Sequence, residues 1–128
     1  MQKTWWSRCG ALFLPMLIIG PANCMAHGCD VAADAINEAA ELLIEVGRQT
    51  NIDDGRRLAR RLQRTVGDAA TEASDCDCEQ SASKLDSAAI QVRRARNADS
   101  RNEFSDHINR AIDDFNVGVA HMEICIVH

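Results

Sequence analysis

The chain has 128 residues, of which 4% are aromatic, with seven glycines and two prolines. This length allows one domain, and the composition excludes collagen-like, Pro/Gly-rich disordered and multi-span membrane proteins. With 14 basic against 19 acidic residues, the formal net charge is −5. A net-acidic chain with few aromatics is poorly suited to nucleic acid, which proteins bind by phosphate neutralisation and base stacking.

Residues 1–26 have the organisation of a secretory signal peptide. Lys3 and Arg8 precede an apolar run over residues 9–19, which is too short to span a bilayer. Small residues at Cys24 and Ala26 predict cleavage after Ala26, leaving a single helical domain of residues 27–128 without a stable membrane anchor. The alternatives are a lipoprotein attached at Cys24, although residues 21–23 match a lipoprotein signal poorly, and an uncleaved N-terminal anchor.

Arginine greatly outnumbers lysine in the mature part, where Lys84 is the sole lysine. This bias is typical of GC-rich bacterial genomes, so the periplasm is the expected compartment and an extracellular location is the alternative.

Four helices are predicted in the mature part, because apolar residues recur there at a period of about 3.6. They cover roughly residues 30–48, 53–73, 79–97 and 101–124. Ser100 and Glu103 form a capping box, which predicts that the third and fourth helices are separate. Short connections between helices of similar length predict an all-α, up-down-up-down four-helix bundle.

Four cysteines remain after the signal peptide: Cys29, Cys76, Cys78 and Cys125. In the predicted bundle they all lie at one end, where an exported domain would form disulfides. A Cys76–Cys78 bridge is disfavoured because its ring would be strained. Two pairings remain open: 29–76 with 78–125, or 29–78 with 76–125. Either way, two disulfides staple one end of the bundle.

A row of arginines follows the outer side of the second predicted helix: Arg56, Arg57, Arg60, Arg61 and Arg64. Arg93, Arg94 and Arg96 form a second basic cluster. Such rows are usually solvated helix faces, and the acidic row of the first helix (Asp34, Glu38, Glu41, Glu45) is expected to offset the charge. The alternative is a surface that binds a partner.

Metal binding is the other chemistry that the sequence offers. If cleavage follows Ala26, His27 presents its α-amine and imidazole together, and His121 and His128 approach the same end of the bundle. Nitrogen ligands of this kind suit Cu(II) or Ni(II). A zinc site of Cys76, Cys78, Cys125 and His128 is a further alternative, although an oxidising compartment favours disulfides over thiolates.

The chain contains no G-x-S-x-G, H-E-x-x-H or Gly-rich phosphate loop, so we expect neither an enzyme nor a bound cofactor. The leading hypothesis is a small exported protein that binds another protein through its surface, as an inhibitor, immunity protein or accessory factor. The competing hypothesis is a periplasmic copper-type metal binder that uses His27.

Overall fold

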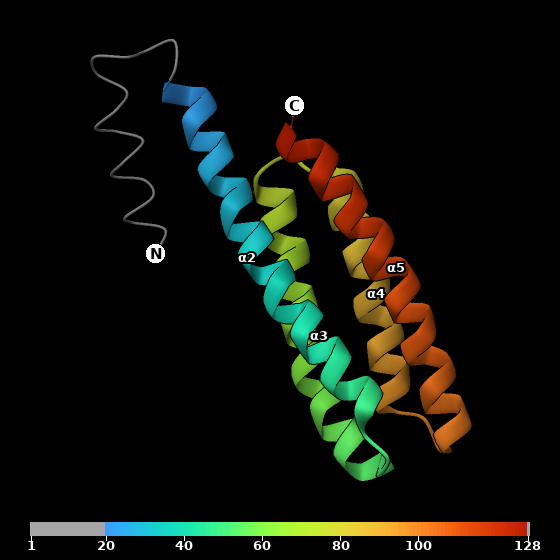
Figure 1. The fold of residues 1–128 in the computed structure, drawn as a ribbon. Coiled ribbons are helices and arrows are strands. Elements are labelled where there is room, and N and C mark those ends of the chain that lie inside the picture. Colours follow the sequence, from blue (N-terminus) through green and yellow to red (C-terminus); the bar gives the residue numbers. More distant parts are fainter. Residues whose placement is uncertain (1–19, 128) are drawn as a thin grey trace.

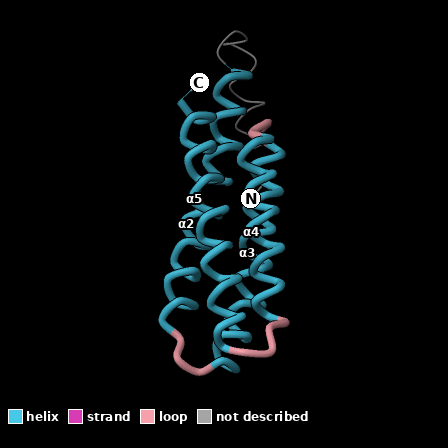
Figure 2. Tube along the Cα trace, turned by 90° about the vertical axis from the view of Figure 1, so that its right-hand side faces the viewer, coloured by secondary structure: helices cyan, strands magenta, loops and turns pink. Residues whose placement is uncertain are grey.

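The computed structural model describes residues 20–127, and within them the side chains of residues 29–126, as four helices without a strand. Helix α2 spans Gly20–Arg48, α3 Ile52–Asp75, α4 Glu79–Arg96 and α5 Arg101–Val127. Consecutive helices lie side by side and are joined by short connections (Figures 1 and 2). The all-α, four-helix prediction is therefore confirmed for this part of the chain.

Hydrogen bonds between neighbouring helices join the beginning of one helix to the end of the other. The Arg56 side chain, in the first turns of α3, donates to the carbonyl of Ala98, just beyond α4. The hydroxyl of Ser81, near the beginning of α4, donates to the carbonyl of Gly118 in the second half of α5, at 2.8 Å. These contacts are those expected of antiparallel neighbours.

Helix α2 begins earlier than the sequence predicted. The expected beginning was near Asp30, whereas the helix already includes Gly20. Pro21 lies in its first turn, where the missing N–H costs no hydrogen bond and the fixed φ suits a helix. Pro21 is therefore compatible with the first turn of α2 and does not break the helix.

Polar residues cap the beginnings of α3 and α5, whereas Cys78 at the beginning of α4 makes no side-chain cap hydrogen bond. Asn51 precedes α3, and its side-chain oxygen accepts from the backbone N–H of Asp53 at 2.8 Å. Ser100 accepts from the N–H of Glu103 at 3.1 Å, as the predicted capping box requires. The Glu103 carboxylate, however, accepts from the N–H of Asp99 instead of that of Ser100. The predicted break between the third and fourth helices is confirmed.

Leucine and valine fill the centre of the bundle, while alanines line the helix contacts. Leu62, Val66, Leu85 and Val92 are fully buried. Ten buried alanines surround them on the four helices, and side chains this small let helix axes approach closely: Ala32, Ala39, Ala59, Ala69, Ala70, Ala73, Ala82, Ala88, Ala95 and Ala111. The periodic apolar positions of the sequence therefore form the core.

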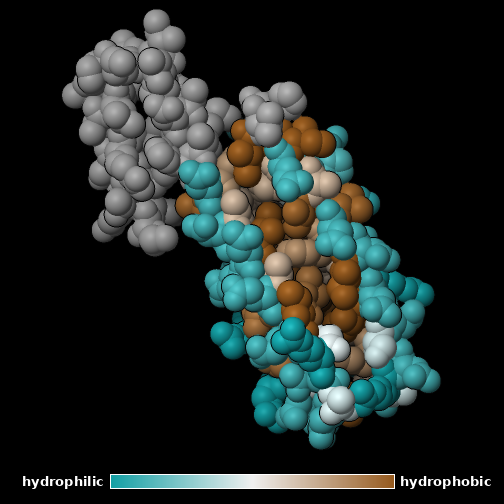
Figure 3. Space-filling model, in the orientation of Figure 1, coloured by the Kyte–Doolittle hydropathy of each residue, from teal (hydrophilic) through white to brown (hydrophobic). Residues whose placement is uncertain are grey.

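The four helices do not pack equally. The contacts of α3 with α4 and of α4 with α5 are extensive, whereas α2 and α5 touch much less. Figure 3 shows apolar side chains along the seam between α2 and α5. Ala40 on α2 and Ile112 and Val119 on α5 are only partly buried. The packing is therefore close between α3 and α4 and between α4 and α5, and looser between α2 and α5.

Two disulfides join the helices at one end of the bundle. Cys29 is bonded to Cys76 and Cys78 to Cys125, with Cα–Cα distances of 5.3 and 6.0 Å. Both distances lie in the range that disulfides require. The structure thus selects the first of the two pairings left open by the sequence, and Cys76 and Cys78 do not pair with each other. Every cysteine among residues 29–126 is in a disulfide.

No helix within the described part of the chain is both long enough and apolar enough to cross a membrane. The predicted signal peptide, with its cleavage site and the alternative lipid attachment at Cys24, lies outside the residues whose side chains are described.

Candidate functional site

The arginine row predicted from the sequence lies on the first half of α3. Arg57, Arg60, Arg61 and Arg64 are exposed and Arg56 is half-buried. Residues four apart lie on the same side of a helix, so Arg56, Arg60 and Arg64 follow one line along α3. Arg57 and Arg61 form a second line beside the first, so the five arginines share one broad side of this half of the helix.

The structure brings part of the second basic cluster beside this row. Arg96 of α4 donates to the side-chain oxygen of Gln63 on α3 at 3.0 Å. Exposed Arg93 lies one turn earlier on the same side of α4, whereas Arg94 is about 100° away around the helix. We name the surface formed by seven of these residues the arginine face: Arg56, Arg57, Arg60, Arg61, Arg64, Arg93 and Arg96.

The sequence indicated two separate basic clusters and did not predict that they form one surface. The signal that could have joined them is the topology, because antiparallel α3 and α4 place the first half of α3 beside the second half of α4. Gln63 and Ala98 then supply the polar partners that hold Arg96 and Arg56 across this boundary.

Few carboxylates neutralise the arginine face. Arg56 pairs with Asp53 at 3.6 Å and Arg57 with Asp54 at 3.3 Å, both within α3. Among the described residues, the other five members of the face form no ion pair. Among the described residues, the acidic row of α2 (Asp34, Glu38, Glu41, Glu45) also makes no ion pair with α3. The expected offset acts at most over longer distances, where water and salt weaken it.

Carboxylates gather instead at the end of α3 that carries the disulfides. Asp68, Glu72 and Asp75 lie on the second half of the helix, and Asp77 and Glu79 follow at the turn into α4. Burial raises the pKa of Glu72 above its usual 4.5, and the negative charges of Asp75 and Asp68 raise it further. Helix α3 therefore has a basic first half and an acidic second half, although the chain as a whole is net acidic.

Replacing Glu72 with glutamine should stabilise the protein at neutral pH. The folded state raises the pKa of Glu72, so protonation of this carboxyl favours folding. This contribution to stability is present below pH 4.5 and disappears as the pH rises through the pKa of Glu72 in the folded state. The neutral E72Q variant should therefore melt slightly above the wild type at pH 7, by an effect within about 0.5 kcal/mol, and the two should converge towards pH 4. Thermal unfolding followed by circular dichroism at pH 7 and towards pH 4 measures the melting temperatures of E72Q and the wild type.

The control for this prediction is Glu123→Gln on α5, an exposed glutamate with no carboxylate three or four positions away. It should show no comparable pH-dependent difference. A melting temperature of E72Q that falls below the wild type at pH 7 would contradict the assigned repulsion.

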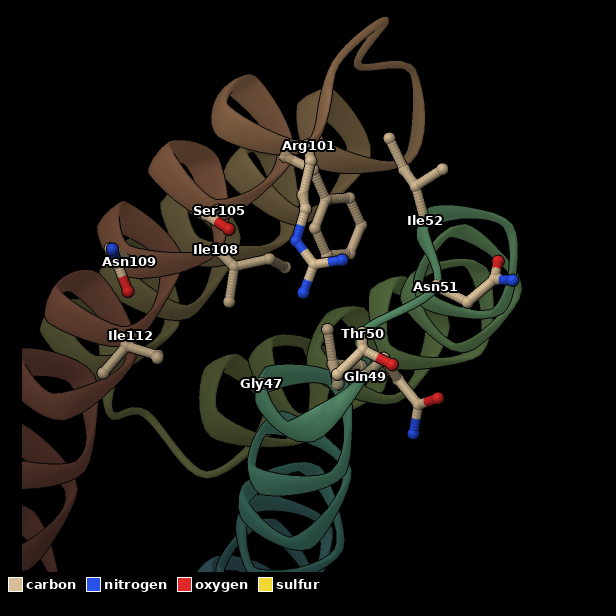
Figure 4. Close-up of a pocket in the computed structure, with 12 residues that line it drawn as sticks. Gly47, Gln49, Thr50, Asn51, Ile52, Arg101, Ser105, Ile108, Asn109 and Ile112 are labelled. Atoms are coloured by element: carbon tan, nitrogen blue, oxygen red, sulfur yellow. The ribbon is translucent and has the colours of Figure 1, made fainter.

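The seam between α2 and α5 contains a small pocket near the loop between α2 and α3. Its volume is about 90 Å³. Figure 4 shows Arg101, Ser105 and Asn109 of α5 on one side and Gln49 and Thr50 of the loop on the other. Sites for small molecules usually measure about 300–1,000 Å³, so this pocket is too small for a ligand of that class.

The histidines of the metal-binding hypothesis are only partly described. His121 lies half-buried on α5, whereas the side chain of His27 and the whole of His128 lie outside the described residues. The copper-type site stays a prediction. His107, which the sequence did not single out, is within hydrogen-bond distance of Gln91 on α4, at 3.1 Å between Nδ1 and Oε1.

Comparisons of the chain with protein-family models, curated proteins and solved structures find no match.

Proposed function

We propose that this chain is a small, exported, non-enzymatic protein that binds an acidic protein partner through the arginine face of α3 and α4. The observation that carries the proposal is a group of five arginines that have no carboxylate partner among the described residues. They lie on two helices that the disulfides and the core hold in place. Arginine is favoured in protein interfaces because its planar guanidinium can bind a carboxylate through two parallel hydrogen bonds.

A protein is a better candidate partner than nucleic acid. The whole chain is net acidic, and its five acidic residues near the disulfide end of α3 would repel a long polyanion. The arginine face also contains no aromatic side chain on which a base could stack. A partner with a compact acidic patch matches the face without approaching the acidic end.

Export is supported by the two disulfides, because such bonds persist in oxidising compartments and are rare in the cytosol. The periplasm is the compartment we propose, on the signal-like N-terminus and the arginine-rich composition.

The test is charge reversal on the arginine face, with a single reversal elsewhere as the control. Arg60→Glu with Arg64→Glu should weaken binding of the partner at least about tenfold, since each change places like charge against its carboxylates. Arg94→Glu is the control, an exposed arginine on another side of α4. The partner is isolated from a periplasmic extract with the wild-type protein, and the affinities of the three proteins for it are measured by calorimetry.

Binding should also weaken as salt is raised, because exposed charges are screened beyond a Debye length of about 8 Å at physiological ionic strength. Circular dichroism should show that all three proteins keep the same helix content. A partner that binds the double variant as tightly as the wild type would refute the arginine face as its binding surface.

A further inference from the structure

The four cysteine sulfurs lie together as one cluster, although they belong to two separate bridges. The Sγ atom of Cys78, which is bonded to Cys125, is 3.7 Å from that of Cys29 and 3.6 Å from that of Cys76. The sulfurs of Cys29, Cys78 and Cys125 all lie within 4.8 Å of one another. Reduction of both disulfides would therefore release four thiols at a single point.

This spacing is close to that of a tetrahedral thiolate site. Zinc–sulfur bonds of about 2.3 Å place neighbouring sulfurs about 3.8 Å apart in a tetrahedron. The two distances measured between the bridges already have this length, and rotation of cysteine side chains can adjust the others. Soft thiolate ligands select Zn²⁺ and Cu⁺ among the common biological cations.

The turn between α3 and α4 directs two of the four sulfurs into the cluster. Asp77 adopts a φ of 66°, in the left-handed region, and separates Cys76 at the end of α3 from Cys78 at the beginning of α4. Both flanking cysteines are buried, whereas Asp77 is exposed. This backbone geometry explains how two cysteines with only one residue between them contribute to the same cluster.

The surrounding charges favour a bound cation. Asp75, Asp77 and Glu79 lie in the turn or beside it, and α3 adds Glu72 one turn earlier. Cys29, Cys76 and Cys78 are buried and Cys125 is half-buried, so the cluster excludes most water but has one accessible member.

We propose that the reduced form of this protein binds one thiophilic d¹⁰ metal ion, Zn²⁺ or Cu⁺, through Cys29, Cys76, Cys78 and Cys125. Each disulfide accepts two electrons and two protons from a dithiol reductant, which itself becomes a disulfide. The resulting thiols then lose their protons to solvent as they bind the metal ion. Oxidation by a protein disulfide reforms both bridges and releases the ion. This inference is independent of the proposed partner binding, which uses the other end of α3.

The experiment uses the full chain with Cys9→Ser and Cys24→Ser, so that only the four cysteines of the cluster carry thiols. The protein is reduced without oxygen and titrated with Co²⁺, whose absorption spectrum reports tetrahedral thiolate ligation. Zn²⁺ and Cu⁺ are then titrated in competition with chromophoric chelators, which separates the two ions. We expect one ion per chain with sub-micromolar affinity in the reduced protein and none in the oxidised protein.

Changing any one of the four cysteines to serine should lower the affinity at least about tenfold, since even indirect supports of a metal site contribute about 10–100-fold. Ser83→Ala, an exposed change on α4, is the control and should leave the affinity within about twofold. Circular dichroism of the same samples reports the fold: if reduction lowers the helix content, the bound ion must restore it.

Three results would overturn the proposal. The first is the lack of sub-micromolar binding of any of the three ions to the reduced protein. The second is binding that leaves the chain unfolded, because unstructured cysteines then suffice. The third is an affinity that survives the cysteine substitutions.

Discussion

A variant with Cys78→Ser and Cys125→Ser is expected to lose about 4 kcal/mol of unfolding free energy. This bridge joins residues 47 positions apart, and closing a loop of that length restricts the unfolded chain by about this amount in the chain-entropy model. The pair Cys29→Ser and Cys76→Ser removes a bridge of the same sequence separation, so its loss should be similar. Urea unfolding followed by circular dichroism measures both variants against the wild type.

Removing both bridges should leave the chain largely unfolded. The combined loss of about 8 kcal/mol is as large as the whole unfolding free energy of many small domains, about 5–15 kcal/mol. Ser83→Ala, an exposed change on α4, is the control and should leave stability within about 0.5 kcal/mol. A loss below about 1 kcal/mol for either single-bridge variant would show that the disulfides do little to stabilise the fold.

Leu85→Ala is expected to cost about 2–5 kcal/mol, the range for truncating a fully buried leucine. Leu85 of α4 packs directly on Gly118 of α5. A Cβ atom at Gly118 would lie 3.1 Å from both Cγ and Cδ2 of this leucine, which is tighter than ordinary contact. The glycine thus provides the space that the leucine fills, and truncation of the leucine leaves a cavity between the two helices.

The coupling between these residues can be measured with a double-mutant cycle. Gly118→Ala alone gains helix propensity, about 1 kcal/mol, but crowds Leu85. In the Leu85→Ala background the crowding is relieved, so the same substitution should be more favourable there. Ile90→Ala, on an exposed part of α4, should cost little. An equal effect of Gly118→Ala in both backgrounds would contradict the packing described here.

The sequence predicted the helices because apolar periodicity and capping residues are local properties. The separation of α4 from α5 followed from Ser100 and Glu103, whose hydrogen bonds lie within four residues. The predicted beginning of α2, near Asp30, was wrong. Pro21 can end one helix or begin another, and the sequence pattern does not distinguish these roles.

The disulfide pairing could not be chosen from the sequence. Cys76 and Cys78 lie at the same end of the bundle in both pairings, and the choice depends on the backbone of the turn at Asp77. The arginine face was predicted only in part, because it also depends on how the helices pack against one another. Periodicity shows which side of a helix is buried, but the rotation of α4 about its axis decides that Arg96 approaches Gln63 while Arg94 does not.

The observed disulfide pairing divides the chain into two covalently closed loops. One loop holds α3 to α2 and the other holds α5 to α4, and Asp77 is the single residue between them. A proteolytic cut at this exposed residue would therefore yield two fragments with no covalent link, each a helical hairpin with its own internal cross-link. The pairing 29–78 with 76–125 would instead have kept the pieces joined. The integrity of the nicked molecule would then depend entirely on the contacts that cross between the hairpins, above all the tightly packed interface of α3 with α4.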